Sequence, residues 1–168
     1  MKPIQIAVCG APQVGKSTLL ERMSSLCGWR ETVRTLWKDA VQIELHARVK
    51  GVDHLFRTLP GPILYFEKRI TELLKDADLI IYVIQPNLME GDDVIQSDFL
   101  DKHLKIAKSL GRDWDAGKWL LVMNKADRAK ESSMLEKFPQ VLRKHVIFTQ
   151  AINGQGLESL LKKIEGMV

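Results

Sequence analysis

The stretch Gly10-Ala11-Pro12-Gln13-Val14-Gly15-Lys16-Ser17 decides the fold of this chain. It matches the pattern of a phosphate-binding loop: a glycine, four residues, then Gly-Lys-Ser. Residues 4–9 form an apolar run of strand length, and residues 18–27 carry apolar side chains at helical spacing, namely Leu19, Leu20, Met23 and Leu26. In a strand–loop–helix unit of this kind, successive N–H groups converge on phosphates and the helix N-terminus adds positive potential. Lys16 is then expected to reach the outer phosphates and the Ser17 hydroxyl to hold Mg²⁺. The alternative is a simple glycine turn.

Length and composition favour one soluble domain over residues 1–168. No apolar run is long enough to cross a bilayer; the longest covers residues 79–84. Residues 1–3 lead straight into a strand, and the chain carries neither a myristoylation start nor a prenylation box, so we expect no signal peptide and no lipid anchor. Two cysteines, Cys9 and Cys27, are too few for a disulfide framework, which favours a reducing cytoplasm.

The net charge of +4 is unevenly distributed along the chain. Residues 1–100 hold 12 basic and 13 acidic side chains, whereas residues 101–168 hold 13 basic and 8 acidic ones. A basic half can indicate an acidic partner, an anionic membrane or nucleic acid. The lysines are scattered, however, which is typical of solvated helix faces, so we expect no nucleic-acid partner.

Apolar patterning predicts strands alternating with helices. Strands are expected at 4–9, 40–50, 55–59, 79–84, 119–123 and 146–148; helices at 18–27, 63–76, 94–110, 131–145 and 156–167; and a loop at 29–39. The helix at 94–110 should turn Ile95, Phe99, Leu104 and Ala107 inward, and Pro139 should kink or split the helix at 131–145. Residues 40–50 and 55–59 should pair as a hairpin. The whole predicts a three-layer α/β domain with a mostly parallel sheet, whose ligand lies at the carboxyl ends of the strands.

A second motif, Asn124-Lys125-Ala126-Asp127, directly follows the strand that ends at Met123. A carboxylate here could accept two hydrogen bonds from the N1–H and 2-amino groups of guanine, a donor pair that adenine lacks. The alternative is that Asp127 merely caps a helix. The position after a strand, downstream of a phosphate loop, favours recognition of guanine.

With these motifs the chain resembles a small GTPase of the Ras-like superfamily over nearly its whole length. Three shorter stretches resemble the bacterial MglA family of polarity and gliding-motility GTPases: residues 34–37, the Thr58-Leu59-Pro60-Gly61 segment, and residues 150–156. The resemblance implies a single G domain with a six-stranded sheet of order 2-3-1-4-5-6 and one antiparallel edge strand.

The resemblance also implies a site for GTP or GDP with Mg²⁺. The nucleotide contacts would come from Gln13, Val14, Gly15, Lys16, Ser17, Thr18, Gly61, Asn124, Lys125, Asp127, Ala151 and Ile152. Asn124 and Asp127 would grip guanine, Lys125 would pack against the loop and ribose, and Ala151 would offer its N–H to the base oxygen. Ser17 and Thr35 would ligate Mg²⁺, with Thr32 as a rival to Thr35. Lys16, Arg34 and Thr35 would act in hydrolysis, Arg34 through the charge that develops on the γ-phosphate, although Arg34 could equally be a surface arginine.

Three positions depart from the superfamily pattern. Thr58 stands where an acidic residue usually holds a water on Mg²⁺, so metal binding is expected to be weaker. Pro62 stands where a glutamine usually orients the attacking water, and proline has neither a polar side chain nor an N–H. Pro12, inside the phosphate loop, alters the space that an inserted arginine from a partner would need. Hydrolysis is therefore expected to be slow.

The resulting prediction is a slow, switching GTPase. Its segments at about 31–39 and 61–70 would respond to GTP and signal to a partner protein, for which the resemblance suggests a roadblock-type regulator. The main alternative is a GTP-binding module with little or no catalysis, a pseudo-GTPase that serves as a scaffold. A P-loop kinase or ATPase and a nucleic-acid binder are further alternatives.

Overall fold

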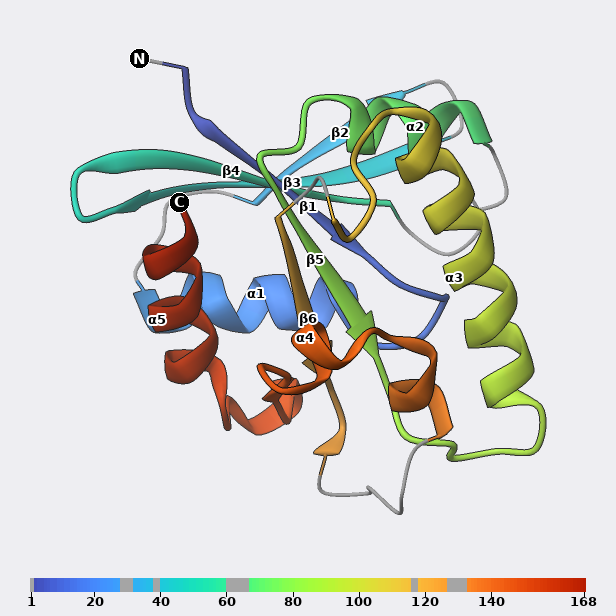
Figure 1. Cartoon of the computed structure of the whole chain (residues 1–168). Coiled ribbons are helices and arrows are strands. Elements are labelled where there is room, and N and C mark those ends of the chain that lie inside the picture. The colour runs from blue at the N-terminus through green and yellow to red at the C-terminus, as the bar shows by residue number, and fades with distance from the viewer. Residues whose placement is uncertain (1, 28–31, 38–39, 60–66, 116–117, 127–132) are drawn as a thin grey trace.

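The computed structural model describes residues 2–27, 32–37, 40–59, 67–115, 118–126 and 133–168, with the backbone alone for 32–37 and 40–42. One sheet of seven strands organises this part of the chain, in the order β2-β3-β4-β1-β5-β6-β7 (Figure 1). The strands are β1 (Ile4–Cys9), β2 (Thr32–Trp37), β3 (Ala40–Val49), β4 (Val52–Thr58), β5 (Leu79–Ile84), β6 (Trp119–Met123) and β7 (Ile147–Phe148). Strands β5 and β6 are apolar and buried along their whole length, as expected for parallel strands covered on both faces of the sheet.

The predicted strand order is confirmed, with one addition at the edge. Without β2, the remaining six strands have the order 2-3-1-4-5-6, and β4, β1, β5, β6 and β7 run parallel to their neighbours. The prediction of a loop at 29–39 is wrong for residues 32–37, which form β2 and pair antiparallel with β3. The sheet therefore has two antiparallel pairs rather than one.

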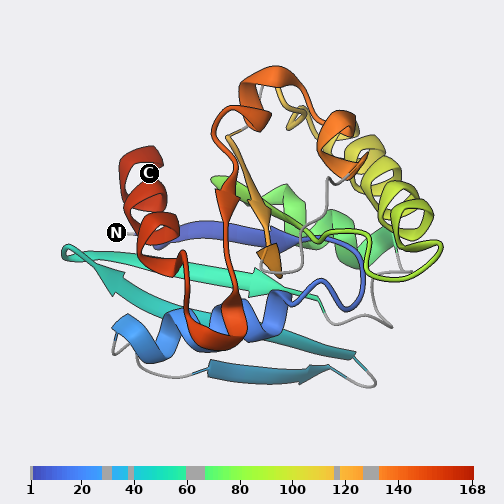
Figure 2. The same cartoon turned by 90° about the horizontal axis from the view of Figure 1, so that it is seen from below.

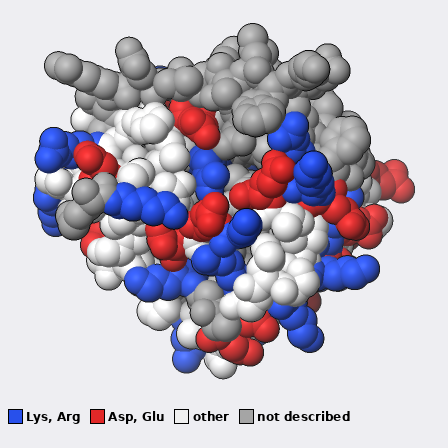
Figure 3. Space-filling view, turned by 90° about the horizontal axis from the view of Figure 1, so that it is seen from above, with Lys and Arg blue, Asp and Glu red and all other residues white. Residues whose placement is uncertain are grey.

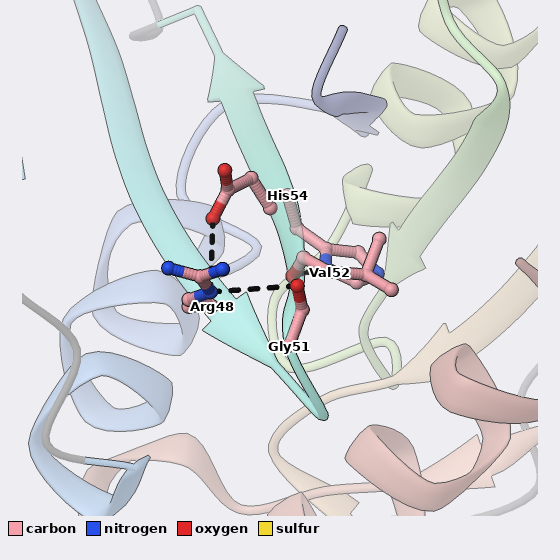
Figure 4. Close-up of polar contacts among 5 residues, drawn as sticks. Arg48, Gly51, Val52 and His54 are labelled. Atoms are coloured by element: carbon pink, nitrogen blue, oxygen red, sulfur yellow. Dashed lines mark hydrogen bonds and ion pairs between the residues drawn. The ribbon is translucent and has the colours of Figure 1, made fainter. Parts of the chain in front are cut away.

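The predicted hairpin is confirmed as β3 and β4, whose registers run from Ile43 opposite Thr58 to Val49 opposite Val52. Its turn is Lys50-Gly51, both with positive φ, which matches a two-residue turn of the kind that suits twisted strands. Figure 4 shows Arg48 at this turn, where its Nε donates to the Gly51 carbonyl at 3.4 Å and lies 3.6 Å from the Asp53 carboxylate.

Helices cover both faces of the sheet. They are α1 (Lys16–Cys27), α2 (Glu67–Lys75), α3 (Asp92–Ser109), α4 (Gln140–Arg143) and α5 (Leu157–Met167), with short 3₁₀ turns η3 (Ser133–Lys137) and η4 (Ala151–Asn153). Figures 1 and 2 show α1 and α5 on one side of the sheet and α2 and α3 on the other. This is the predicted three-layer arrangement, and its core is built from the apolar faces of these elements.

Two details of the helix predictions are wrong. Leu26 in α1 and Ile95 in α3 were expected to face inward, but they are 55% and 52% exposed. In α3 the buried stripe consists of Gln96, Phe99, Leu100, His103, Ile106 and Ala107. Phe99 and Ala107 therefore face inward as predicted, and Leu104 is partly buried against the core. The split at Pro139 is confirmed, because Pro139 lies directly between η3 and α4.

Surface charges are interspersed where the chain is described. On the face shown in Figure 3, acidic and basic side chains alternate. No helix among the described residues is both long and apolar enough to span a membrane.

Candidate nucleotide-binding site

The phosphate loop connects β1 to α1 and depends on two close backbone approaches. At Gly10 (φ +147°) a Cβ would lie 2.3 Å from the Val83 carbonyl oxygen. At Gly15 (φ +94°) a Cβ would lie 2.3 Å from Asn124 Nδ2. Any larger residue would therefore displace β5 or Asn124, which explains both glycines.

Lys16 is the first residue of α1, and its amine is folded back over the loop. Lys16 Nζ donates to the carbonyls of Gly10 at 3.0 Å and Ala11 at 2.7 Å. Its side chain is buried, and burial lowers the Lys16 pKa to about 8, with nearby Cys9 opposing that shift. A buried cation in this position suits an anionic ligand, because a phosphate would stabilise its charged form.

Asn124 joins the phosphate loop to the loop after β7. Its Nδ2 donates to the Val14 carbonyl at 2.9 Å, while its Oδ1 accepts from Ala151 N at 3.0 Å and from Thr149 Oγ1 at 3.1 Å. Asn124 itself is only 2% exposed. One carboxamide thus fixes the spacing of two loops that lie 110 and 27 residues away in sequence.

One further contact and a cavity complete this rim. Lys125 Nζ donates to the Gln13 carbonyl at 2.7 Å, so the Lys125 side chain lies against the phosphate loop. A cavity of about 150 Å³ opens beside these groups and is lined by Gly15, Thr18, Asn124, Lys125, Gln150, Ala151 and Ile152. Seven residues from three separate segments therefore share one cavity; six of them are predicted nucleotide contacts, and the seventh, Gln150, directly precedes one.

Ala151 differs in detail from its predicted role. Its N–H was expected to face the oxygen of the base, but it donates to Asn124 Oδ1. It would reach a base only by sharing that hydrogen. Thr149, which sequence reasoning missed, anchors the same carboxamide; the one signal for it was a polar residue directly after a short apolar strand.

The Thr58 side chain is hydrogen-bonded within the sheet. Its side chain is fully buried and donates from Oγ1 to the Val8 carbonyl of the neighbouring strand at 2.8 Å. The hydroxyl proton is thereby used, and only the neutral oxygen's lone pairs remain to accept a hydrogen bond. Among the described residues, no group of three or more His, Cys, Asp and Glu side chains is placed to hold a metal ion.

Several predicted site residues lie outside what the structure describes. These are Gly61 and Asp127 entirely, and the side chains of Arg34 and Thr35. The backbones of Arg34 and Thr35 lie in β2, where they are opposite Ile43 and Gln42. Ser17, the other predicted metal ligand, is half-buried in the first turn of α1.

The fold and the rim of the site match those of a P-loop G domain. In sequence, the chain is 25% identical over 181 aligned residues to GTPase Der of Prochlorococcus marinus (strain MIT 9313), with 95% of this chain aligned. It spans 36% of the length of that relative. No protein-family model matches the chain.

Solved structures give the same class. The chain superposes on the G domain of the FeoB iron transporter of T. maritima with a TM-score of 0.66 and 26% identity, covering 99% of both chains. The cytosolic domain of that transporter, solved in apo and GDP forms, aligns at a TM-score of 0.63 and 22% identity, over 99% of this chain and 64% of its own.

Proposed function

We propose that this G domain binds GTP and GDP with Mg²⁺, hydrolyses GTP slowly, and acts as a molecular switch. The observation that carries the proposal is the Asn124 network, because it ties a phosphate-binding loop to a second loop at the mouth of one cavity. Likeness to GTPase Der and to the FeoB G domain supports guanine as the base.

In this proposal each segment has a physical role. The N–H groups of residues 13–18 and the amine of Lys16 hold the phosphates, since both present positive charge at the N-terminus of α1. Lys125 covers the base side of the loop, and Asp127 accepts the two guanine donors. Mg²⁺, held by Ser17 and Thr35, would neutralise phosphate charge when bound.

We also propose that β2 is the moving element. Thr35 lies in the edge strand, three strand spacings from β1, or about 14 Å at ordinary strand separation. Since β1 leads directly into the phosphate loop, ligation of a metal beside Ser17 would require Thr35 to approach from this edge position. Binding of GTP would therefore detach residues 32–37 from β3, and hydrolysis would let them return.

Amide hydrogen exchange tests this movement. Amides of β2 and β3 that bond across the pair, between residues 32–37 and 40–45, should exchange faster in a non-hydrolysable GTP complex than in the GDP complex. Amides of the β3–β4 pair beyond Ala47 serve as an internal control and should not change. Equal protection of β2 in both complexes would contradict the movement.

Base specificity tests the proposed ligand. Nucleotide released from gently purified protein should be GDP or GTP. Asp127→Asn should lose GDP affinity and gain affinity for xanthosine diphosphate, since an asparagine amide complements the second carbonyl of xanthine as a carboxylate complements the amino group of guanine. A variant that still prefers GDP would remove Asp127 from base recognition.

Thr58 favours a second candidate, a nucleotide-binding module that hardly hydrolyses GTP. Its buried neutral hydroxyl replaces the carboxylate that would help to hold Mg²⁺. Single-turnover phosphate release from protein loaded with GTP distinguishes the two candidates. Release that slows in Arg34→Ala supports the switch, whereas no release over hours, with or without a partner, supports the module.

We further propose that the protein is an MglA-like switch with a protein regulator. Residues 34–37, 58–61 and 150–156 support an MglA-like switch that works in the cytoplasm with a protein regulator, for which a roadblock-domain protein is the first candidate. Nucleotide-dependent binding of such a protein, lost when β2 residues are substituted, would test it.

A further inference from the structure

Gln96 occupies a core position of α3 that an apolar residue would normally fill. It begins the buried stripe that continues through Phe99, Leu100 and His103, and it is 3% exposed. A buried carboxamide is costly unless both of its ends are hydrogen-bonded. Both are: Gln96 Oε1 accepts from Gln85 N at 2.9 Å, and Gln96 Nε2 donates to Gln85 O at 3.1 Å.

Gln85, whose backbone N–H and carbonyl are bonded to Gln96, lies between the two loops of the nucleotide site. Gln85 directly follows β5, beside which α3 runs (Figure 1). On one side of β5, the Val83 carbonyl limits the approach of Gly10. On the other, the Ile84 carbonyl accepts from Asn124 N at 2.8 Å. The phosphate loop and the Asn124 loop are thus both positioned against the last residues of one strand.

We infer that Gln96 is a positioning residue that holds the end of β5 so that the two loops keep the spacing nucleotide binding needs. This inference rests on the proposed binding of guanine nucleotide. The two bonds act as an extra rung beyond the last residue of β5. Without them, buried donor and acceptor groups of Gln85 lose their partner, and the strand end can move away from both loops.

The test is the dissociation rate of GDP from wild type and two Gln96 variants. Gln96→Met keeps the length and approximate volume of the side chain but cannot bond to Gln85. GDP should dissociate from it at least about tenfold faster, because tenfold corresponds to one lost buried hydrogen bond and this variant loses both bonds to Gln85. Ile106→Ala is the matched control, because it opens a cavity in the same helix about 15 Å away and should lower stability while leaving the dissociation rate unchanged.

Gln96→Glu adds a readout that a purely structural role would not move. When protonated, its carboxyl group offers Gln85 the same acceptor and donor as the amide; when ionised, it offers no donor. Burial at this position should raise the pKa of the introduced carboxyl group well above its ordinary value of about 4.3, so that the group is protonated at pH 5.5 and ionised at pH 8.5. The ratio of variant to wild-type dissociation rates should therefore be near one at pH 5.5 and about tenfold at pH 8.5. A ratio independent of pH, or a wild-type rate in Gln96→Met, would overturn the inference.

Failure of the proposed function would be recognised separately. If the wild type binds no guanine nucleotide, that function fails, and Gln96 is judged by amide hydrogen exchange in the nucleotide-free protein. Faster exchange at residues 10–17 and 124–126 in Gln96→Met than in Ile106→Ala would support its positioning role. Equal exchange in both variants would overturn it.

Discussion

Truncation of Asn124 to alanine removes the three hydrogen bonds that join the loops of the site. The bonds are 2.9 to 3.1 Å long, and they leave the Val14 carbonyl, the Ala151 N–H and the Thr149 hydroxyl without this partner. At about 1 kcal/mol for each bond, the free energy of unfolding of the nucleotide-free protein should fall by about 3 kcal/mol. The loops should also lose their relative placement, so GDP should bind more weakly.

Urea denaturation with and without GDP separates the two effects. For the wild type, GDP at one hundred times its dissociation constant should raise the free energy of unfolding by about 2.7 kcal/mol. At the same GDP concentration, Asn124→Ala should lose most of that increment. Thr149→Val is the control, because it removes one of the three bonds, should cost about 1 kcal/mol and should keep most of the increment. An undiminished GDP increment in Asn124→Ala would refute a bridging role for this residue.

Three further predictions concern pH and the loop glycine. Burial lowers the His103 pKa to about 3, whereas the unfolded chain binds this proton near pH 6.5, so the contribution of His103 to the free energy of unfolding is fully present above pH 6.5 and is lost as the pH falls toward 3. From pH 8 to 5.5 the loss due to this residue should be about 1.4 kcal/mol. Urea titrations should show that loss in the wild type and not in His103→Phe, and an equal loss in both would exclude His103 as its cause. Because the Lys16 pKa is about 8 and phosphates favour the charged amine, GDP affinity measured by calorimetry should fall about fourfold from pH 7 to pH 8.5, whereas a constant affinity would contradict that linkage. Gly15→Ala places a methyl group 2.3 Å from Asn124 Nδ2 and should abolish measurable GDP binding. The control Gly166→Ala, whose new methyl group meets no atom within 4 Å, should bind GDP as the wild type does. Normal binding by Gly15→Ala would refute the close approach.

Local patterns in the sequence were sufficient for most of the sheet. Strands β5 and β6 are continuous apolar runs, and β3 alternates, so each strand could be predicted from its own residues. Strand β2 could not, because it lies at the edge and owes its conformation to the ladder that β3 supplies. An edge strand requires no apolar pattern of its own.

The inward face of α3 was predicted only in part, for a related reason. Counting apolar residues placed Ile95 inward, but two polar residues, Gln96 and His103, occupy core positions of the helix. Each is buried through a partner in or directly after β5: Gln96 bonds to the backbone of Gln85, and His103 Nδ1 lies 3.2 Å from the Tyr82 hydroxyl. A long-range hydrogen bond leaves no periodic signal in the sequence.

The residues of the candidate site likewise fall into those that the sequence predicts and those that depend on long-range contacts. The phosphate loop and Asn124 could be recognised because their residue types and spacing are set by local geometry. Thr149 and the use of the Ala151 N–H could not, because both depend on where the Asn124 carboxamide lies across the cavity. The Thr58 hydroxyl likewise found its acceptor in β1, fifty residues away.

Competition of GDP against ADP for the purified protein tests the central claim most directly. If the site built around Asn124 and Lys16, with Asp127 as the proposed contact to the base, recognises guanine, GDP should bind at least about a thousandfold more tightly than ADP, since a site that hydrogen-bonds specific donors rejects a base that lacks them. Equal affinities for GDP and ADP would contradict guanine recognition and leave only a phosphate-binding loop.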